Sequence, residues 1–165
     1  MTNNSPFFSI IIPTRNRPEL FHQALKSVYE QSFLNKEIII VNDGSTNEYL
    51  EEYKALESQY QDISFHYLVH RPNGHGQSYS MNFGVSQATG KYVCFLDDDD
   101  YWTDDNYLQK AYTHLSTYKK TADLYYSNQK AYFSNGEQQA NNVWIEDLIA
   151  QAPNKAEPYK EVFIV

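Results

Sequence analysis

Short runs of apolar residues alternate along this chain with longer segments whose apolar residues recur at the spacing of one helical face. Residues 8–12, 37–41 and 92–96 are rich in β-branched and aromatic residues, which favour strands. Between the first two runs, residues 18–28 repeat apolar side chains at a helical period. Strand–helix–strand units pair their strands in parallel and cover the sheet with helices. We therefore predict an α/β fold, a three-layer α/β/α sandwich around a mostly parallel sheet.

The ends of the predicted helices carry recognisable signals. Pro18 suits the first turn of a helix whose buried face includes Leu20. Ser45 and Glu48 have the spacing of a capping box at the start of a second helix. Gly90 is predicted to end a third helix as a left-handed cap. These boundaries leave polar loops at the ends of the strands.

Further elements are predicted toward the C-terminus. Thr103 can cap a fourth helix, which continues to Leu115. Residues 92–96 are apolar throughout, so this strand is predicted to be buried on both faces. Additional strands are predicted at residues 63–68, 122–126, 130–133 and 162–165. Because the chain stops inside the last of these apolar runs, we expect a domain that is truncated at its C-terminus.

The chain has 165 residues, and no linker, repeat or low-complexity tract divides it. We therefore expect residues 1–165 to form a single domain. Its lone cysteine, Cys94, cannot form a disulfide within the chain, which favours a reducing compartment. No apolar run approaches the ~20 residues that a transmembrane helix needs. These features predict a cytoplasmic location, and a peripheral role at a membrane through another part of a longer protein stays open.

The charge is unevenly distributed. Lysine and arginine number 13 against 21 acidic residues, for a net charge of -8, and six of the acids lie within residues 97–105. Binding of nucleic acid requires clustered lysine and arginine, so we do not expect nucleic acid as a partner. A polyanionic ligand can approach the acidic cluster only if a divalent cation neutralises it.

Three polar segments come directly after predicted strands: residues 13–17, 42–45 and 97–100. In open α/β sheets, ligands bind outside the carboxyl ends of the strands, where loops from different strands converge. We therefore expect these three segments to meet at one crevice and to form a ligand site there.

Of the three segments, the run of four aspartates at residues 97–100 indicates a specific chemistry most clearly. If the strand continues, Asp97 and Asp99 lie on one side of it and Asp98 on the other. Mg²⁺ and Mn²⁺ take carboxylate oxygens and complete their shell with substrate phosphates. The alternative is a solvated acidic turn at the start of the next helix. We favour metal binding for Asp97 and Asp99, and the helix-end role for Asp104 and Asp105.

Other polar residues admit two interpretations each. Asp43 can accept a hydrogen bond from a pyrimidine base, or it can close an Asx-turn before Gly44, and the sequence does not separate these roles. The guanidinium groups of Arg15, Arg17 and Arg71 can each donate two hydrogen bonds to phosphate oxygens, although each arginine alone is more typical of a surface cation. The five histidines show no zinc-ligand spacing.

The segments Ser9–Arg17, Glu37–Ser45 and Gly90–Trp102 resemble the family 2 glycosyltransferases of GT-A fold. Residues 73–84 fit the same family's order and spacing, so that the resemblance covers about the first 105 residues. It implies a single GT-A domain, of the nucleotide-diphospho-sugar transferase type. The implied reaction moves a sugar from a nucleotide-diphosphate donor, most often a UDP-sugar, to an acceptor hydroxyl with inversion. Mn²⁺ or Mg²⁺ is the implied cofactor, and a glycan, a lipid or a protein is the implied acceptor.

The resemblance also implies roles for single residues. It places the nucleotide against Pro13, Thr14, Arg15, Asn16, Asp43, Arg71, Asn82 and Asp98. Asp43 would bind the base, Asp98 would lie near the ribose, and Asp97 and Asp99 would hold the divalent ion. Many members have Ala-Arg-Asn where this chain has Ser80-Met81-Asn82, so Arg71 or His75 would replace the phosphate-facing arginine.

The general base of an inverting member is an Asp or Glu from a later part of the domain. Glu146 and Asp147 are the candidates in this chain. The alternative is a non-catalytic nucleotide-sugar-binding fragment, which lacks the general base and the acceptor site.

Overall fold

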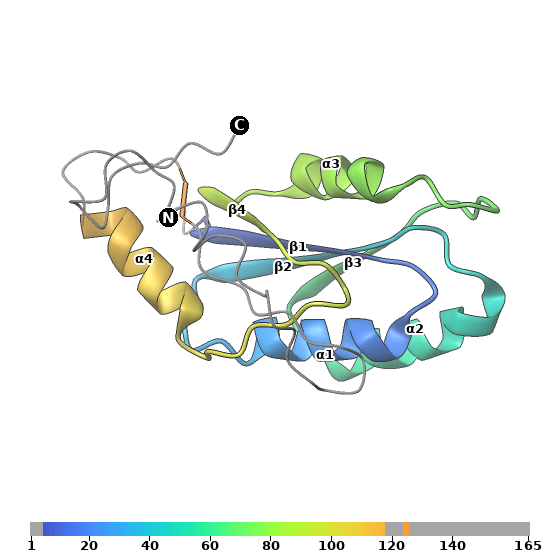
Figure 1. The fold of residues 1–165 in the computed structure, drawn as a ribbon, viewed down its shortest axis with the longest axis horizontal. Helices are drawn as coiled ribbons and strands as arrows, with labels where there is room; N and C mark the ends of the chain where they lie inside the picture. Colours follow the sequence, from blue (N-terminus) through green and yellow to red (C-terminus); the bar gives the residue numbers. More distant parts are fainter. Residues whose placement is uncertain (1–4, 118–123, 126–165) are drawn as a thin grey trace, which may run out of the picture. The chain divides into compact units, whose positions relative to one another are not determined.

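The computed structural model describes residues 5–117 and 124–125, and within them the sheet is wholly parallel (Figure 1). Its strands are β1 (Phe8–Thr14), β2 (Lys36–Asn42), β3 (Ile63–Tyr67) and β4 (Tyr92–Phe95). They lie in the order β3-β2-β1-β4. This order places the carboxyl ends of β1 and β2 side by side at the centre of the described sheet, as the predicted mostly parallel sheet requires.

Helices cover both faces of this sheet. They are α1 (Pro18–Tyr29), α2 (Asn47–Gln59), α3 (Gln77–Gln87) and α4 (Tyr107–Thr117). Figure 1 shows α1 and α2 below the sheet and α3 above it, which confirms the predicted three-layer α/β/α sandwich. All of these elements belong to one compact unit, residues 1–119. Among the described helices, none combines the length and the apolar character that crossing a membrane requires.

The core lies on both sides of β1 and β2. Every residue of β1 is buried, and the inner face of α1 contributes Phe21, Leu25 and Val28 to the layer below. On the other face, α3 approaches β1 at Gly84, where an added Cβ would lie 2.5 Å from Cγ2 of Ile11. The missing side chain thus lets α3 pack close to the strands, which brings the start of α3 to their carboxyl ends.

Two predicted details of the first helices are wrong. Leu20 is 43% exposed and lies off the buried face of α1. The helix α2 begins at Asn47, and its N-cap residue Thr46 makes no side-chain capping bond. The Ser45 hydroxyl instead accepts a hydrogen bond from the backbone N–H of Asn16, at 3.0 Å. A contact between two loops has therefore replaced the predicted capping box.

The caps predicted for the later helices are also wrong. The helix α3 ends at Gln87, and Gly90 does not have a positive φ. Gly90 is needed for space, because an added Cβ would lie 2.5 Å from the Ser9 hydroxyl oxygen. The helix α4 begins at Tyr107, too far along the chain for Thr103 to cap it. The Asp104 carboxylate is the acidic group at this end, where it accepts the N–H of Asn106 at 2.9 Å.

The strand β4 differs from its prediction in burial and in the conformation of the residues after it. Val93 and Phe95 are 38% and 49% exposed, since β4 is an edge strand of the described sheet. The aspartates do not continue the strand, because Asp100 N–H bonds to the carbonyl of Asp97 at 3.1 Å and closes a turn. The strands predicted at residues 122–126, 130–133 and 162–165 lie outside the described residues, apart from Leu124 and Tyr125, which have no regular secondary structure.

Candidate functional site

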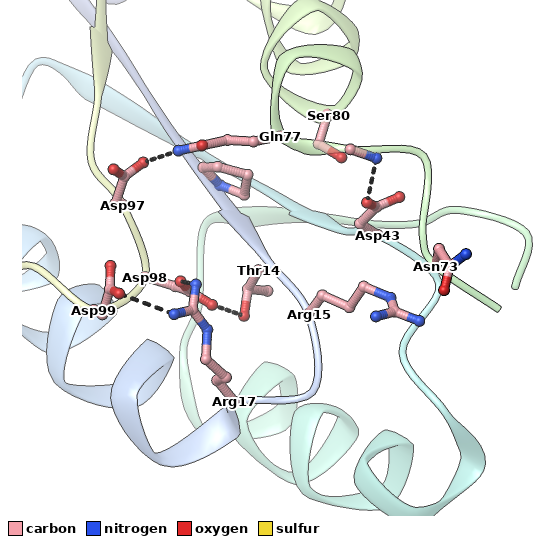
Figure 2. A pocket seen from close by; sticks show the side chains of 12 residues that line it. Thr14, Arg15, Arg17, Asp43, Asn73, Gln77, Ser80, Asp97, Asp98 and Asp99 are labelled. Atoms are coloured by element: carbon pink, nitrogen blue, oxygen red, sulfur yellow. Dashed lines mark hydrogen bonds and ion pairs between the residues drawn. The ribbon is translucent and has the colours of Figure 1, made fainter. Parts of the chain in front are cut away.

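A pocket of about 350 Å³ opens where β1 and β2 end and the loop before α3 passes over them (Figure 2). It is lined by Pro13, Thr14, Arg15, Arg17, Asp43, Asn73, Gly76, Gln77, Ser80, Asp97, Asp98 and Asp99. All three polar segments contribute to this lining, so their predicted convergence is confirmed. Figure 2 shows the acidic turn on one side of the pocket, Asp43 and Asn73 on the other, and Thr14 between them.

The acidic turn is held to the body of the protein through Asp98. This residue is 1% exposed, and its carboxylate accepts the Thr14 hydroxyl at 2.8 Å. The Thr14 hydroxyl also contacts the Tyr53 hydroxyl at 2.8 Å, and Tyr53 OH accepts the backbone N–H of Arg17 at 3.0 Å. The guanidinium of Arg17 donates to both Asp98 and Asp99. The turn is therefore an anchored structure rather than a set of aspartates fanning into water.

The electrostatics of this cluster result from burial and from charge pairing. Burial raises the pKa of Asp98, and this effect together with the negative charge of Asp99 outweighs the Thr14 hydrogen bond and the charge of Arg17. Burial also raises the pKa of Asp100, with a further contribution from Asp99. Burial lowers the pKa of Arg17, but the two carboxylates that it contacts raise that pKa above its usual value. Burial and mutual repulsion make the ionised forms of Asp98 and Asp100 unfavourable, and a positive charge added at this turn would stabilise those ionised forms.

Asp97 and Asp99 each use one oxygen in a contact across the pocket. Gln77 from α3 donates to Asp97 Oδ1 at 2.6 Å, and Arg17 donates to Asp99 Oδ2 at 2.9 Å. Nowhere in residues 5–117 and 124–125 do three or more metal-ligating side chains gather as a cation site. Two carboxylates nevertheless suit Mg²⁺ or Mn²⁺, because such ions are commonly held by one or two carboxylates plus substrate phosphates. The donor set thus fits a cation that arrives with a phosphorylated ligand.

The carboxylate of Asp43 anchors the loop that precedes α3. It accepts the backbone N–H groups of His75 and Gly76, at 2.8 and 2.9 Å, and contacts Nδ1 of the His75 ring at 2.7 Å. The nearby turn is closed instead by Asn42, whose side-chain oxygen accepts the N–H of Ser45 at 2.8 Å. Asp43 therefore does not close an Asx-turn, and its position at the pocket leaves the base-binding role as a prediction.

Arg15 and Asn16 tie the loop after β1 to its neighbours. Arg15 donates to the backbone carbonyls of Arg71 and Pro72, at 3.2 and 2.9 Å. The side-chain oxygen of Asn16 accepts the N–H of Thr46 at 2.9 Å, and Asn16 itself has a positive φ of 55°. Arg15 lines the pocket, whereas Asn16 supports it from outside the lining. Both residues thus fix the shape of the loop beside the pocket.

Besides Asn16, two described candidate residues lie outside the pocket lining, and two further candidates fall on residues that the structure does not describe. Arg71 and Asn82 are exposed, and their side chains are not part of its lining. Glu146 and Asp147 lie outside the described residues. The roles of these four residues in donor binding and base catalysis stay predictions.

The pocket also contains Gln77 and Ser80, which were not among the predicted site residues. Gln77 and Ser80 come from the first turns of α3, and their backbone positions at the pocket depend on how that helix crosses the sheet. Ser80 is fully buried, and its hydroxyl has no hydrogen-bond partner within the described part of the chain. Both residues belong to the segment 73–84, whose order and spacing fit the family, but neither was predicted as a site residue.

A curated protein is similar to this chain in sequence. A β-1,3-glucosyltransferase of Campylobacter jejuni, named for GalNAc(5)-diNAcBac-PP-undecaprenol, is 37% identical over 95 residues, which are 58% of this chain and 30% of that protein. This chain therefore spans less than a third of that curated relative's length.

Two solved structures resemble this one in fold. The mannosyltransferase PcManGT of Pyrobaculum calidifontis, in complex with GDP-Man and Mn²⁺, matches with a TM-score of 0.58 and 24% identity, over 67% of this chain and 32% of that chain. Residues 1–349 of Staphylococcus aureus TarS, in complex with UDP-GlcNAc, match with a TM-score of 0.55 and 22% identity, over 78% of this chain and 41% of that chain. At these identities the two structures establish a likeness of fold alone, that of the GT-A transferases.

The sequence itself establishes the family. The model described as Glycosyl transferase family 2 matches residues 9–165, a stretch that includes every residue of the pocket. The polar segments that line the pocket are also the segments on which the resemblance was based. On this agreement of sequence and fold, the chain belongs to glycosyl transferase family 2.

Proposed function

We propose that this chain provides the donor-binding part of a glycosyltransferase. The enzyme would move a sugar from a nucleotide-diphosphate donor, which we take to be a UDP-sugar, to an acceptor hydroxyl, with a divalent cation and with inversion. The observation that carries this proposal is the pocket itself, where Thr14, Asp43 and the turn Asp97–Asp99 come together at the ends of parallel strands. The TarS structure, solved with UDP-GlcNAc, supports the choice of a UDP-sugar.

The arrangement of the pocket supports different roles for its two sides in binding a nucleotide. Asp43 and Asn73 lie on one side and the acidic turn on the other, so a nucleotide that spans the pocket has its base near Asp43 and its diphosphate near Asp97 and Asp99 (Figure 2). Thr14 lies between the two sides, where the ribose would be. The loop that Asp43 holds in place, through the N–H groups of His75 and Gly76, would border the base.

Asp97 and Asp99 are the residues that would hold the cation. When bound, a divalent ion stabilises the negative charge that develops on a departing diphosphate. The Mn²⁺ in the PcManGT complex supports the use of such an ion. Gln77, which donates to Asp97 Oδ1, would orient that carboxylate toward the ligand.

The proposed reaction is a single displacement at the anomeric carbon. The acceptor oxygen forms its bond to that carbon while the bond to the diphosphate oxygen breaks, and the hydroxyl proton passes to a carboxylate base. Glu146 and Asp147 remain our candidates for that base. The name of the Campylobacter relative describes a lipid-linked glycan, which supports a glycan or a lipid-linked glycan as the acceptor class.

Isothermal titration calorimetry with UDP tests the donor site. We expect heat of binding in the presence of Mn²⁺, a much weaker response in EDTA, and a weaker response to GDP than to UDP. A chain that binds no nucleoside diphosphate with Mn²⁺ would contradict the proposal. Tighter binding of GDP would instead overturn the choice of donor.

An assay of sugar transfer and of donor hydrolysis on the same chain tests the reaction. We expect release of UDP from a UDP-sugar, and transfer when a suitable acceptor is present. Binding of UDP and Mn²⁺ without either reaction would favour the alternative, a nucleotide-sugar-binding fragment without a general base.

A further inference from the structure

Arg17 occupies the side of the acidic turn that faces the pocket. Its two terminal nitrogens form a fork over neighbouring aspartates: one pairs with Asp98, and the other lies 2.9 Å from Asp99 Oδ2 (Figure 2). The guanidinium thus already supplies a positive charge to the turn. A divalent ion that approaches Asp99 must compete with this charge and with the hydrogen bond that uses one Asp99 oxygen.

The two halves of the fork differ in strength. The side chain of Asp98 is 2% exposed, whereas that of Asp99 is 50% exposed. The Arg17 side chain is itself 47% exposed, but loss of this partner would leave the buried charge of Asp98 uncompensated and poorly hydrated, which is costly. An exposed pair contributes little, because water solvates both partners once they separate. Arg17 can therefore release Asp99 far more easily than Asp98.

We propose that Arg17 is an internal counter-cation of the acidic turn, which gives up Asp99 and keeps Asp98 when a divalent cation binds. The inference rests on the proposed function, because it takes Asp97 and Asp99 as the cation's ligands. Arg17 is thus a positioning residue: it holds the turn in shape before the cation arrives. It also makes the cation bind weakly by itself, since two positive charges must share one site.

The charge balance connects cation binding to the nucleotide. Arg17 and a divalent ion together bring three positive charges to the three carboxylates of Asp97, Asp98 and Asp99. The turn is then neutralised and no longer repels the diphosphate of a donor. Cation and nucleotide would therefore bind more tightly together than separately, and Arg17 would contribute one of the positive charges behind that coupling.

The test measures binding of Mn²⁺ alone, from the electron paramagnetic resonance signal of the free ion. The variant Arg17→Met removes the charge and keeps an apolar stem of similar length. We expect it to bind Mn²⁺ about tenfold more tightly than the unaltered chain, as removal of one nearby positive charge predicts. The matched control is Lys26→Met in α1, the helix that Arg17 precedes; Lys26 is a 59% exposed side chain that does not line the pocket. It changes the net charge equally and should leave Mn²⁺ affinity unchanged.

A second variant guards against loss of folding. Arg17→Lys keeps a charge for buried Asp98 but has a single ammonium in place of the fork, so it cannot bond both carboxylates in the same way. We expect its affinity for Mn²⁺ to lie between those of the unaltered chain and Arg17→Met. In EDTA, thermal unfolding should show a lower Tm for Arg17→Met, and Mn²⁺ should raise that Tm more than it raises the Tm of the unaltered chain.

An unchanged or weaker Mn²⁺ affinity in the Arg17 variants would overturn the inference. So would a gain in Lys26→Met equal to that in Arg17→Met, or the absence of Mn²⁺ binding in every variant. Titration of the unaltered chain with UDP and Mn²⁺ together separates this failure from failure of the proposed function. If UDP still binds with Mn²⁺, only the role of Arg17 is wrong, whereas loss of UDP binding contradicts the donor site itself.

Discussion

At the scale of single residues, the pocket must hold three consecutive carboxylates, Asp97, Asp98 and Asp99, whose negative charges repel one another. Asp98 is buried, where it bonds Thr14 and pairs with Arg17, whereas Asp99 remains half exposed. Asp97 is oriented by Gln77 from the opposite side of the pocket. The three neighbours thus have three different environments, and the two flanking carboxylates remain accessible to a ligand.

The division between Asp99 and Asp104 gives the first prediction. Asp99 lines the pocket, whereas Asp104 lies near the start of α4, where it accepts the N–H of Asn106. We expect Asp99→Ala to weaken Mn²⁺-dependent binding of UDP by at least about tenfold, as loss of a metal-site residue does. Calorimetry measures this change, and Asp104→Ala serves as the control that should leave UDP binding unaltered. Equal effects of the two substitutions would contradict the assignment of the metal role to the acidic turn.

At the scale of secondary-structure elements, the close contact at Gly84 and a network of hydrogen bonds around Glu37 fix how the elements meet. Gly84 lets α3 approach β1. The carboxylate of Glu37, at the start of β2, accepts the Ser9 hydroxyl at 2.5 Å and the N–H groups of Thr89 and Gly90 at 2.7 and 3.1 Å. This network joins β1, β2 and the segment that leads into β4. These hydrogen bonds therefore join the strands at their amino-terminal ends, and the pocket lies at their carboxyl ends.

Gly84→Ala tests the close approach of α3. In an open helix this change would stabilise the protein by about 1 kcal/mol. Here the new methyl group would lie 2.5 Å from Cγ2 of buried Ile11, so we expect a net loss of about 1–3 kcal/mol in the free energy of unfolding. Urea denaturation measures the loss, with Gln87→Ala at an exposed position of the same helix as the control. A stabilised Gly84→Ala protein would contradict the packing described for α3.

The Glu37 network predicts a dependence of stability on pH. Although desolvation opposes it, the hydrogen bonds from Ser9, Thr89 and Gly90 lower the pKa of Glu37 below its usual 4.5. This carboxylate therefore stabilises the fold above the unfolded pKa, and the contribution is lost as pH falls through the lower folded pKa. We expect Glu37→Gln to cost about 1–2 kcal/mol at pH 7, as loss of charge-assisted hydrogen bonds does.

Urea denaturation at several pH values measures the effect of Glu37→Gln. The difference from the unaltered chain should shrink as the pH falls through the lowered pKa of Glu37, where the carboxylate of the unaltered chain takes up its proton. Glu51→Gln is the control, because Glu51 is 83% exposed and pairs only with exposed Lys54 among its described neighbours. A deficit for Glu37→Gln that is independent of pH would show that the charge of Glu37 does not carry the effect.

At the scale of the whole described unit, residues 1–119, the pocket exists because segments distant in sequence meet. Thr14 bonds Asp98, and Asp43 bonds His75 and Gly76, so the loops after β1 and β2, the turn after β4 and the start of α3 hold one another. A ligand that binds across these contacts binds the folded unit and not the unfolded chain. Donor binding and global stability should therefore be linked.

Thermal unfolding with UDP measures this linkage. With Mn²⁺ present and UDP at about 100 times its Kd, we expect a stabilisation of about 2.7 kcal/mol and a corresponding rise in Tm. Removal of Mn²⁺ by EDTA should abolish most of the rise, because the diphosphate then lies against unneutralised carboxylates. A rise in Tm with UDP that persists in EDTA would contradict the proposed need for a cation.

The sequence by itself determined the order and type of the described elements. Its apolar periods and strand-end segments predicted β1 to β4, the helices between them and the convergence of the three polar segments. These features are readable because periodicity and chain order are local properties. The predicted place of Pro18 in the first turn of a helix is confirmed. The predicted caps at Ser45, Gly90 and Thr103 are wrong; Ser45, for example, bonds the backbone of Asn16, which is distant in sequence.

Only the tertiary structure decided how the pocket residues are used. Asp43 was a candidate for a local turn or for a base, and it became the anchor of the loop at residues 75–76. The fork of Arg17 over Asp98 and Asp99, and the contact of Gln77 with Asp97, join residues that are far apart along the chain. Sequence periodicity cannot predict such pairs, because which polar groups meet depends on the distance and angle at which helices and strands pack. That packing was set by contacts such as Gly84 against Ile11, which exist only in the folded chain.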